Sequence, residues 1–343
     1  MKILIVGDFK HEMYSKALFN AFKRIENDVH PFMVDEFNYK GNNNIFYFLE
    51  RFQNRFLIGP KICQINSALL EMVKEQKPDL VFLYRTVEVN AKLISKIKSL
   101  GCIIFSYNND DPFSGIPSKA YWRNYLKTAA ICDHNFVYRQ KNRIDFEKIG
   151  IENVSILKPY YIKENNFPIV GDKLMDVVFI GHFENDGRDK YIKALIDAGV
   201  NITVFGDEMW KQAPLYEEIK FVLKESKRGA EYNISLNEAK IALVFLSKIN
   251  SDTYTRRCFE IPATKTLMLS EYTSDLNSMF EADKEAVYFT SSEDLVQKCK
   301  NLLNNPSIIS EIGDAGYNKL LKDGHSIESR AKEILTRYSQ VKK

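Results

Sequence analysis

The chain has 343 residues and a formal net charge of +3, and 45% of its residues are hydrophobic and 27% charged. This length exceeds what one ordinary core fills and suits two globular domains. Basic residues are interspersed with acidic ones rather than clustered, which argues against a nucleic-acid partner.

Five cysteines occur at wide spacings and form no C-x-x-C pair. An odd number with such spacing is typical of reduced thiols and indicates neither a disulfide framework nor a metal site. The first residues lack the apolar stretch of a signal peptide, and no apolar run approaches the roughly 18 residues that span a bilayer. We therefore expect a cytoplasmic protein, either soluble or peripheral at the inner face of the membrane.

Short apolar runs alternate with helical patterns along the first half of the chain. Ile3 to Val6 ends at Gly7 like a buried parallel strand, and apolar residues then recur at helical spacing from Met13 to Ile25. The same alternation predicts strands at 29–34, 80–84, 102–107, 135–138 and 154–157, with helices near 62–74, 93–100, 118–131 and 140–149.

Residues 158–174 change character, with turn formers and little periodicity, and we interpret them as a linker. The alternation then restarts with a strand at 177–180 that ends at Gly181. Further strands are predicted at 202–205, 241–246, 267–269 and 287–289, with helices near 189–198, 253–263, 291–304, 306–321 and 326–339.

This repeated alternation predicts an α/β protein with two Rossmann-like domains, each a parallel sheet covered by helices. We expect a first domain over residues 1–165, a second over 175–325, and a C-terminal helix within 326–343 that packs back towards the first. Ligands of open parallel sheets bind beyond the carboxyl ends of the strands. The two sheets are therefore expected to face a central cleft.

The segment 253–265 contains several charged side chains close together in the sequence. Its adjacent Arg256 and Arg257 could pair with phosphate oxygens through forked donors, and a nearby helix N-terminus adds free N–H groups. Glu260 lies one turn further, where a carboxylate could accept two ribose hydroxyls. The alternative is a solvated helix start in which Glu260 pairs with an arginine, and the residues alone leave both interpretations open.

Several short motifs keep a fixed order along the chain. Residues 257–263 and 267–270 lead into a run of further matches downstream, and Phe179-Ile180-Gly181 precedes them. In this order the chain resembles the CgeB-like (spore-maturation-type) glycosyltransferases over most of its length. The remaining matching positions are 77–81, 110–112, 188, 195, 199, 206, 275–276, 280, 285–289, 293–295, 305–306, 315–316, 325–326 and 330.

The resemblance implies a GT-B fold, in which the C-terminal domain holds the nucleotide and the N-terminal domain holds the acceptor. It implies a glycosyltransferase of cell-surface glycan biosynthesis that moves a hexose from a nucleotide-diphosphate donor, with UDP-sugar favoured, to a hydroxyl with retention of anomeric configuration. The nucleotide sugar is then a substrate, and no cofactor or metal is expected. The partners would be this donor and a sugar, lipid-linked glycan or protein acceptor.

The family pattern also assigns donor-binding residues. Glu260 matches the glutamate that binds the donor ribose, Arg257 a position near the diphosphate, and Gly181 with His182 the loop that approaches the phosphates. The full donor-binding set expected here is Gly181, His182, Arg188, Asp252, Tyr254, Arg256, Arg257, Glu260 and Lys265.

Two positions depart from the family pattern. The family often has glycine where Lys265 stands, so this lysine either adds a phosphate contact or blocks close approach of the backbone. Retaining relatives often place a second glutamate eight residues before the ribose glutamate, and here that position is Asp252, a shorter carboxylate.

The expected reaction needs charge stabilisation and a proton acceptor. Cations stabilise the charge that builds on a leaving diphosphate without a metal, and Arg188, Arg257 and Lys265 are candidates for that role. Asp110 and Asp111, at a strand end of the first domain, are candidate catalytic bases. The alternative is that an Asp before proline caps a turn. The weaker candidates for this role, which follow the first strand, are Asp8 and His11.

Aromatic residues between 46 and 56 are interleaved with Arg51 and Arg55. They could contact a membrane or a lipid-linked acceptor. The interpretation we favour is a helix that packs its apolar side inward and turns its arginines outward.

Neither glycine-rich stretch is a nucleotide fingerprint. No Gly-Lys-Ser/Thr follows Gly181 and Gly187, and Gly7-Asp8 is not a dinucleotide motif, so a dehydrogenase is not indicated. Two alternatives to a glycosyltransferase stay open, a sugar-nucleotide epimerase and a non-catalytic nucleotide-sugar-binding protein. The departures at Asp252 and Lys265 keep the second alternative open.

Overall fold

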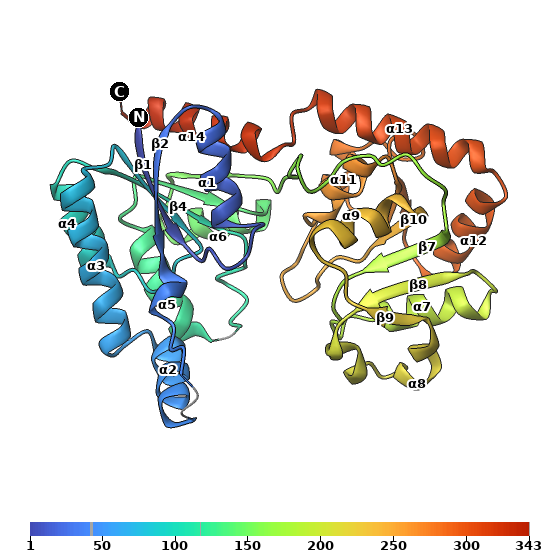
Figure 1. Cartoon of the computed structure of the whole chain (residues 1–343), viewed down its shortest axis with the longest axis horizontal. Helices are drawn as coiled ribbons and strands as arrows, with labels where there is room; N and C mark the ends of the chain where they lie inside the picture. The colour runs from blue at the N-terminus through green and yellow to red at the C-terminus, as the bar shows by residue number, and fades with distance from the viewer. Residues whose placement is uncertain (42–43, 117, 343) are drawn as a thin grey trace. The chain divides into compact units, whose positions relative to one another are not determined.

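The computed structural model describes residues 1–41, 44–116 and 118–342. It divides the chain into two compact units, Met1–Lys158 with Ile327–Lys343, and Pro159–Ser326. Each unit is built around one six-stranded sheet (Figure 1). The first unit ends at residue 158 and the second begins at residue 159, whereas the sequence analysis expected the first domain to end at 165 and the second to begin at 175. Lys343 lies outside the described residues.

The sheet of the first unit has the strand order β2-β1-β3-β4-β5-β6, and all its pairings are parallel. Its central strands are continuous apolar runs because helices cover both faces of the sheet. The predicted six strands are all present, as β1 (Lys2–Gly7), β2 (Asp28–Met33), β3 (Leu80–Tyr84), β4 (Ile103–Asn108), β5 (His134–Val137) and β6 (Val154–Ile156).

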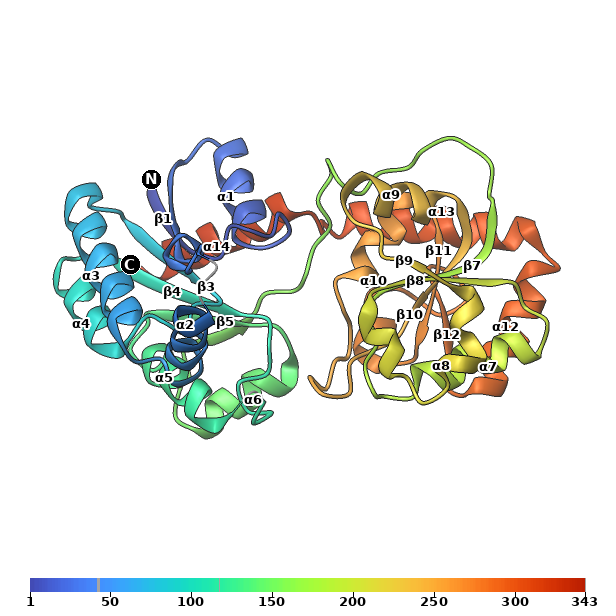
Figure 2. The same ribbon diagram turned by 60° about the horizontal axis from the view of Figure 1, so that its bottom comes forward.

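The helices of the first unit divide between the two faces of its sheet, with α1 and α14 on one face and α3, α4 and α5 on the other (Figure 2). Local signals set their ends, as where Asn90 caps α4 by accepting from the Leu93 N–H at 2.9 Å. The helices are α1 (Ser15–Arg24), α2 (Asn44–Phe56), α3 (Pro60–Gln76), α4 (Ala91–Ser99), α5 (Lys119–Ala129), α6 (Gln140–Lys148) and α14 (Ile327–Val341), with a 3-10 turn η1 (Val34–Phe37).

Helix α2 confirms the predicted helix between residues 46 and 56, but the expected inward packing is wrong. None of the residues of α2 is buried. The polar contacts that turn its apolar side outward are described below.

The sheet of the second unit has the order β12-β11-β10-β7-β8-β9, again with every pairing parallel. Numbered from its first strand, this is the 3-2-1-4-5-6 order of the Rossmann fold. One strand, β9, was not anticipated because it is short and half-polar. The strands are β7 (Met175–Ile180), β8 (Ile202–Gly206), β9 (Leu223–Glu225), β10 (Ala239–Val244), β11 (Leu267–Glu271) and β12 (Val287–Phe289).

Helices also cover both faces of this second sheet, with α7, α8 and α12 on one face and α9 and α13 on the other (Figure 2). The helix predicted over 253–263 is reduced to a single turn that begins at Arg257, and Pro262, which lacks the N–H that would continue it, limits it at the other end. The helices and 3-10 turns are α7 (Arg188–Asp197), η2 (Glu208–Gln212), α8 (Tyr216–Ile219), η3 (Lys220–Val222), α9 (Gly229–Asn237), α10 (Arg257–Glu260), η4 (Pro262–Thr264), α11 (Ser274–Met279), α12 (Ser292–Leu303) and α13 (Pro306–Lys322).

The segment interpreted as a linker is bonded to the second unit. Asn233 and Asn237, one turn apart on α9, hold the backbone of Phe167 and Ile169, and the shortest of these bonds runs from the Ile169 N–H to Asn237 Oδ1 at 2.7 Å. Residues 159–174 therefore form an extended strap on this unit rather than a free connection.

Two glycines let α13 approach the backbone of the second unit. A Cβ at Gly316 would stand 2.5 Å from the Glu285 carbonyl oxygen, and a Cβ at Gly313 would collide with the Lys265 carbonyl oxygen. Because these neighbours are backbone atoms, a side chain cannot be accommodated by a simple rotamer change.

We expect Gly316→Ala to lower the stability of the second unit by about 1–3 kcal/mol, a loss that exceeds the roughly 1 kcal/mol that alanine adds in helix propensity. The chain has two tryptophans, Trp122 in the first unit and Trp210 in the second. In a Trp122→Phe background, Trp210 fluorescence during urea unfolding would measure the effect. Gly171→Ala is the matched control, since nothing lies within 4 Å of its added Cβ. An unchanged midpoint for Gly316→Ala would contradict the packing argument.

Candidate donor-binding site

Strands β7 and β10 are neighbours in the second sheet, yet the chain leaves them towards opposite edges of that sheet. In open parallel sheets, such a switch point opens a crevice at the carboxyl ends of the two strands. The segments that follow these ends are 181–188 after β7 and 245–257 after β10. They contain most of the residues that the sequence assigned to the donor.

Arg257 is held at this edge by a single backbone contact. Its Nε donates to the Ile180 carbonyl oxygen at 2.7 Å, and its guanidinium carbon lies 5.9 Å from the centre of the Phe179 ring. Among the described residues, no hydrogen bond or ion pair engages its two Nη atoms. A Cβ at residue 181 would stand 2.7 Å from Nη2, so glycine is required there for the guanidinium to keep this position.

Arg188 lies at the end of the segment 181–188, and its guanidinium is hydrogen-bonded entirely within the protein. Its guanidinium makes a bidentate pair with Asp186, at 2.8 Å from Nε and 2.6 Å from Nη2, and Nη1 donates to the His182 carbonyl oxygen at 2.6 Å. The side chain is almost fully buried. The predicted role as a phosphate contact does not fit this geometry, which instead fixes the shape of the loop over residues 182–188.

Glu184 ties the two segments of the edge together. It accepts from the Ser247 hydroxyl at 2.6 Å and contacts His182 Nε2 at 3.1 Å. Burial raises the pKa of this carboxyl, but hydrogen bonds from His182 and Ser247 and the charge of Arg188 outweigh burial and lower its pKa to about 2. Glu184 is therefore ionised near neutral pH, and it bridges the carboxyl ends of β7 and β10.

Glu260 has both carboxylate oxygens engaged within the protein. Oε1 pairs with Arg256 Nε at 2.8 Å, and Oε2 accepts from the Tyr232 hydroxyl at 2.9 Å. Burial raises the pKa of Tyr232, so this phenol stays a donor. This is the arginine pairing left open as the alternative interpretation of Glu260, and binding a ribose would require exchange of one of these contacts.

The loop after β10 carries the other two predicted donor residues. The Asp252 N–H donates to the Ser247 carbonyl oxygen at 2.9 Å, which folds the loop back on the strand end. Tyr254 is buried against Phe259, with ring centres 6.4 Å apart. Both residues help to shape the loop that leads into Arg257.

Lys265 is not brought to this edge. It immediately precedes β11, so it lies at the amino end of a strand parallel to β7, across the sheet from Gly181. Its Nζ pairs with Asp314 at 2.8 Å. Its φ is +60°, a left-handed conformation that glycine adopts most readily, and this residue ends the turn η4. The predicted phosphate contact is therefore wrong.

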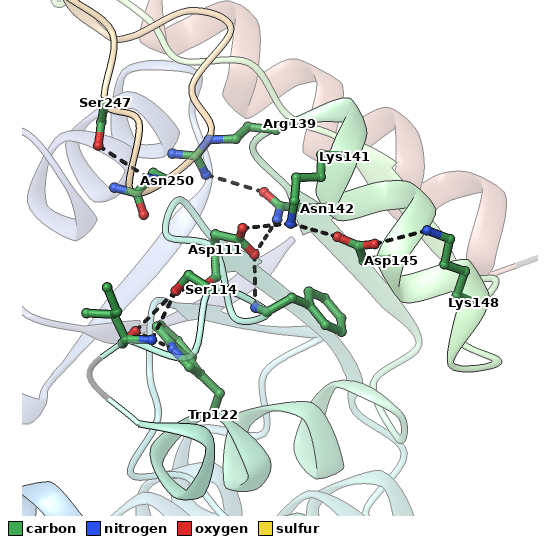
Figure 3. A network of polar contacts seen from close by, with 12 residues as sticks. Asp111, Ser114, Trp122, Arg139, Lys141, Asn142, Asp145, Lys148, Ser247 and Asn250 are labelled. Atoms are coloured by element: carbon green, nitrogen blue, oxygen red, sulfur yellow. Dashed lines mark hydrogen bonds and ion pairs between the residues drawn. The ribbon is translucent and has the colours of Figure 1, made fainter. Parts of the chain in front are cut away.

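In the first unit, Asp111 has the turn-forming role that was the alternative to catalysis (Figure 3). Its Oδ1 accepts from the Phe113 N–H and from Asn142 Nδ2, both at 2.9 Å, and Oδ2 pairs with Lys141 at 2.8 Å. The residue is buried. A carboxylate with this many donors is poorly suited to take a proton from a substrate.

Asp110 is more accessible than Asp111 and lies beside Arg85. The Arg85 Nη2 atom is 2.6 Å from Asp110 Oδ2, and Arg85 follows β3 with a φ of +52°. The switch point of this sheet lies between β1 and β3, so the Arg85–Asp110 pair stands next to the expected crevice of the first unit. After β1, Asp8 caps its own turn by accepting from the Lys10 N–H, and His11 is exposed.

The sequence analysis missed three polar partners at the donor edge, namely Glu184, Asp186 and Ser247. Glu184 and Asp186 stand four and two residues before Arg188, and that spacing was the available signal. Within the described residues, no group of three or more His, Cys, Asp or Glu side chains could hold a metal ion. In the same part of the chain, no helix combines the length and the apolar character needed to cross a membrane.

The pKa of Glu184 gives a prediction for stability. Because its folded pKa of about 2 lies below the ordinary 4.5, the ionised carboxylate stabilises the fold above pH 4.5, and this contribution is lost as pH falls from 4.5 towards 2. We expect Glu184→Gln to lower stability at neutral pH by roughly 1–2 kcal/mol, less than the full shift in pKa implies because solvent screens a partly exposed group, and this difference to fall to a few tenths of a kcal/mol near pH 2. Trp210 fluorescence in the Trp122→Phe background would follow urea unfolding across this range. The exposed Glu225→Gln serves as control, and a pH-independent difference for Glu184→Gln would contradict the argument.

Comparisons with known proteins bear on the predicted fold and on the predicted glycosyltransferase function. The glycosyl transferase-like family matches residues 188–336, which span most of the second unit. No curated protein sequence matches the chain. The family match agrees with the predicted glycosyltransferase, and the CgeB-like subfamily stays a prediction.

Solved structures resemble the whole chain. A sucrose-phosphate synthase from Thermosynechococcus elongatus is 10% identical, with a TM-score of 0.70 and 99% of each chain covered. HepE of Anabaena in complex with UDP-glucose is 12% identical, with a TM-score of 0.68, covering 99% of this chain and 100% of that one. A putative UDP-N-acetylglucosamine 2-epimerase from Listeria monocytogenes is 12% identical, with a TM-score of 0.59, covering 97% and 94%. At such identities the likeness shows the fold alone, and it confirms the prediction that the chain has the GT-B fold of glycosyltransferases.

Proposed function

We propose that the protein is a glycosyltransferase that takes a sugar from a nucleotide-diphosphate donor, with UDP-sugar favoured, and transfers it to a hydroxyl acceptor. The observation that carries this proposal is Arg257. It presents a guanidinium at the carboxyl edge of the second sheet, with Nε fixed by Ile180 and the Nη atoms directed to no described partner. Such a cation suits a diphosphate, which offers several oxygens to forked donors.

The local electrostatics support a leaving diphosphate at this place. Helix α7 begins at the same edge, after Gly187, and a helix N-terminus carries a partial positive charge. When the bond between sugar and diphosphate breaks, negative charge grows on the leaving group, and Arg257 with this partial charge would stabilise it. We propose on this basis that no metal ion is needed.

We propose that the first unit binds the acceptor. Of the two predicted catalytic carboxylates, Asp110 remains the candidate, because Asp111 is buried and fully bonded. Asp110 would have to exchange its contact with Arg85 for an acceptor hydroxyl. Retention of the anomeric configuration and a role in cell-surface glycan synthesis follow from the CgeB-like resemblance, and a cytoplasmic location follows from the sequence analysis; all three are part of the proposal.

One alternative function has a specific observation in its favour. The fold is shared with the putative UDP-N-acetylglucosamine 2-epimerase of Listeria monocytogenes. An epimerase would use the same cation for the nucleotide but would rearrange the sugar without transferring it to an acceptor. The two functions therefore predict the same binding residues and different products.

We expect Arg257→Ala to weaken nucleotide diphosphate binding by about tenfold or more, since hydrogen bonds to charged groups contribute about 1.5–3 kcal/mol. Gly181→Ala should act in the same direction, because the new Cβ displaces the guanidinium. Isothermal titration with UDP measures both. Gly171→Ala and Arg143→Ala are matched controls at exposed positions, Gly171 before the amino end of β7 and Arg143 in the first unit. Equal affinities for wild type and Arg257→Ala would overturn the site assignment.

A donor screen tests the function itself. We expect UDP-sugars to raise the melting temperature more than GDP-, TDP- or CMP-sugars. We also expect UDP release that persists with a chelator present, and an NMR spectrum of the product that shows the donor's anomeric configuration. Interconversion of donor epimers without UDP release would identify the epimerase instead. Stabilisation by nucleotide with neither product would identify a binding protein.

A further inference from the structure

Helix α2 turns its apolar side away from the protein. It lies at one end of the first unit, beyond α3 and α5 (Figure 1). The apolar and aromatic side chains of this helix are between 45% and 69% exposed, and the five that share one stripe of the helix define the surface that we call the α2 face, namely Ile45, Phe48, Leu49, Phe52 and Phe56. Contiguous exposed apolar surface of this kind marks an interaction site.

The opposite side of α2 is polar and faces the protein. Lys61, itself buried at the start of α3, places its Nζ 2.8 Å from Glu50 Oε1, 2.9 Å from Asn54 Oδ1 and 2.6 Å from Asn38 Oδ1. Gln53, on the same side of α2, accepts from the Lys61 N–H at 2.9 Å. Because these side chains of α2 contact the buried Lys61, the polar stripe of the helix faces the protein and its apolar stripe faces outward.

The exposed charges on α2 itself have one sign. Glu50, the acidic residue of α2, has 12% of its side chain exposed and is neutralised by Lys61. The exposed charges of the helix are Arg51 and Arg55, which lie one turn apart, with their guanidinium carbons 6.0 Å from the rings of Tyr47 and Phe56. The α2 face is therefore aromatic with two cations at its border.

We propose that the α2 face is a docking surface for an anionic lipid bilayer. Aromatic side chains suit the boundary between headgroups and acyl chains, and flanking arginines suit anionic headgroups. A second copy of the chain fits less well, because symmetric pairing of the α2 face would bring four arginines together. The inference is independent of the proposed function, since every residue that carries it lies outside the donor edge.

The test is flotation of the full chain with lipid vesicles. We expect binding to vesicles of phosphatidylcholine mixed with phosphatidylglycerol, and much weaker binding to phosphatidylcholine alone or at high salt. Phe48→Ser with Phe52→Ser should lower the partition coefficient by about tenfold or more, as removal of buried apolar area requires. Arg51→Ala with Arg55→Ala should lower it by about fivefold for each arginine on anionic vesicles.

Matched controls separate a local effect from a general one. Phe221→Ser removes an equally exposed aromatic from the second unit, and Lys211→Ala with Lys220→Ala removes two exposed cations there. These controls should bind vesicles like wild type, and all variants should keep the wild-type unfolding midpoint and UDP affinity. The proposal is overturned if wild type does not bind anionic vesicles or if the α2 variants bind as well as wild type. It is also overturned if light scattering shows a dimer that Phe48→Ser with Phe52→Ser abolishes while vesicles stay unbound.

Discussion

The arrangement of the donor edge depends on the contact between Arg257 and the end of β7. One backbone carbonyl, that of Ile180, fixes Nε, and the absence of a side chain at residue 181 leaves room for the guanidinium. This contact is available because β10 lies beside β7, so that the loop after β10 returns the chain to the end of β7. The Rossmann strand order thus places a cation where a diphosphate would meet the start of α7.

The other arginines of this edge are paired with carboxylates of the protein, so the number of arginines at the edge does not tell how many can bind a phosphate. Arg188 and Arg256 each pair with a carboxylate of the protein, Asp186 and Glu260, and breaking a buried pair such as that of Arg188 costs about 3–5 kcal/mol. A ligand cannot recover that cost from one phosphate contact. The paired arginines therefore rigidify the loops, and the arginine with uncommitted Nη atoms is the one suited to an anion.

Of the strands that the structure describes, the sequence was sufficient for all but β9, and it was insufficient for the direction of individual side chains. Apolar runs that end at Gly7 and Gly181 predicted both parallel sheets, because a strand buried on two faces has few polar residues. Arg188 is fully hydrogen-bonded within the protein because its guanidinium donates to a backbone carbonyl and to a carboxylate two residues away. No pattern of residue types specifies these contacts. The position of Lys265 was available from the sequence, because a residue immediately before the predicted strand at 267–269 lies at the amino edge of its sheet.

For helix α2, the sequence predicted the helix but not which of its two faces turns towards the protein. Periodicity tells which residues of a helix share a face, but both faces of an amphipathic helix satisfy the same pattern, and the direction is decided by what lies beneath it. Here Lys61 is buried and needs oxygen partners, since an unpaired buried charge is strongly unfavourable. Glu50 and Asn54 supply those partners only if the polar side of α2 turns inward. A single buried ammonium group on α3 thus accounts for the outward aromatic surface.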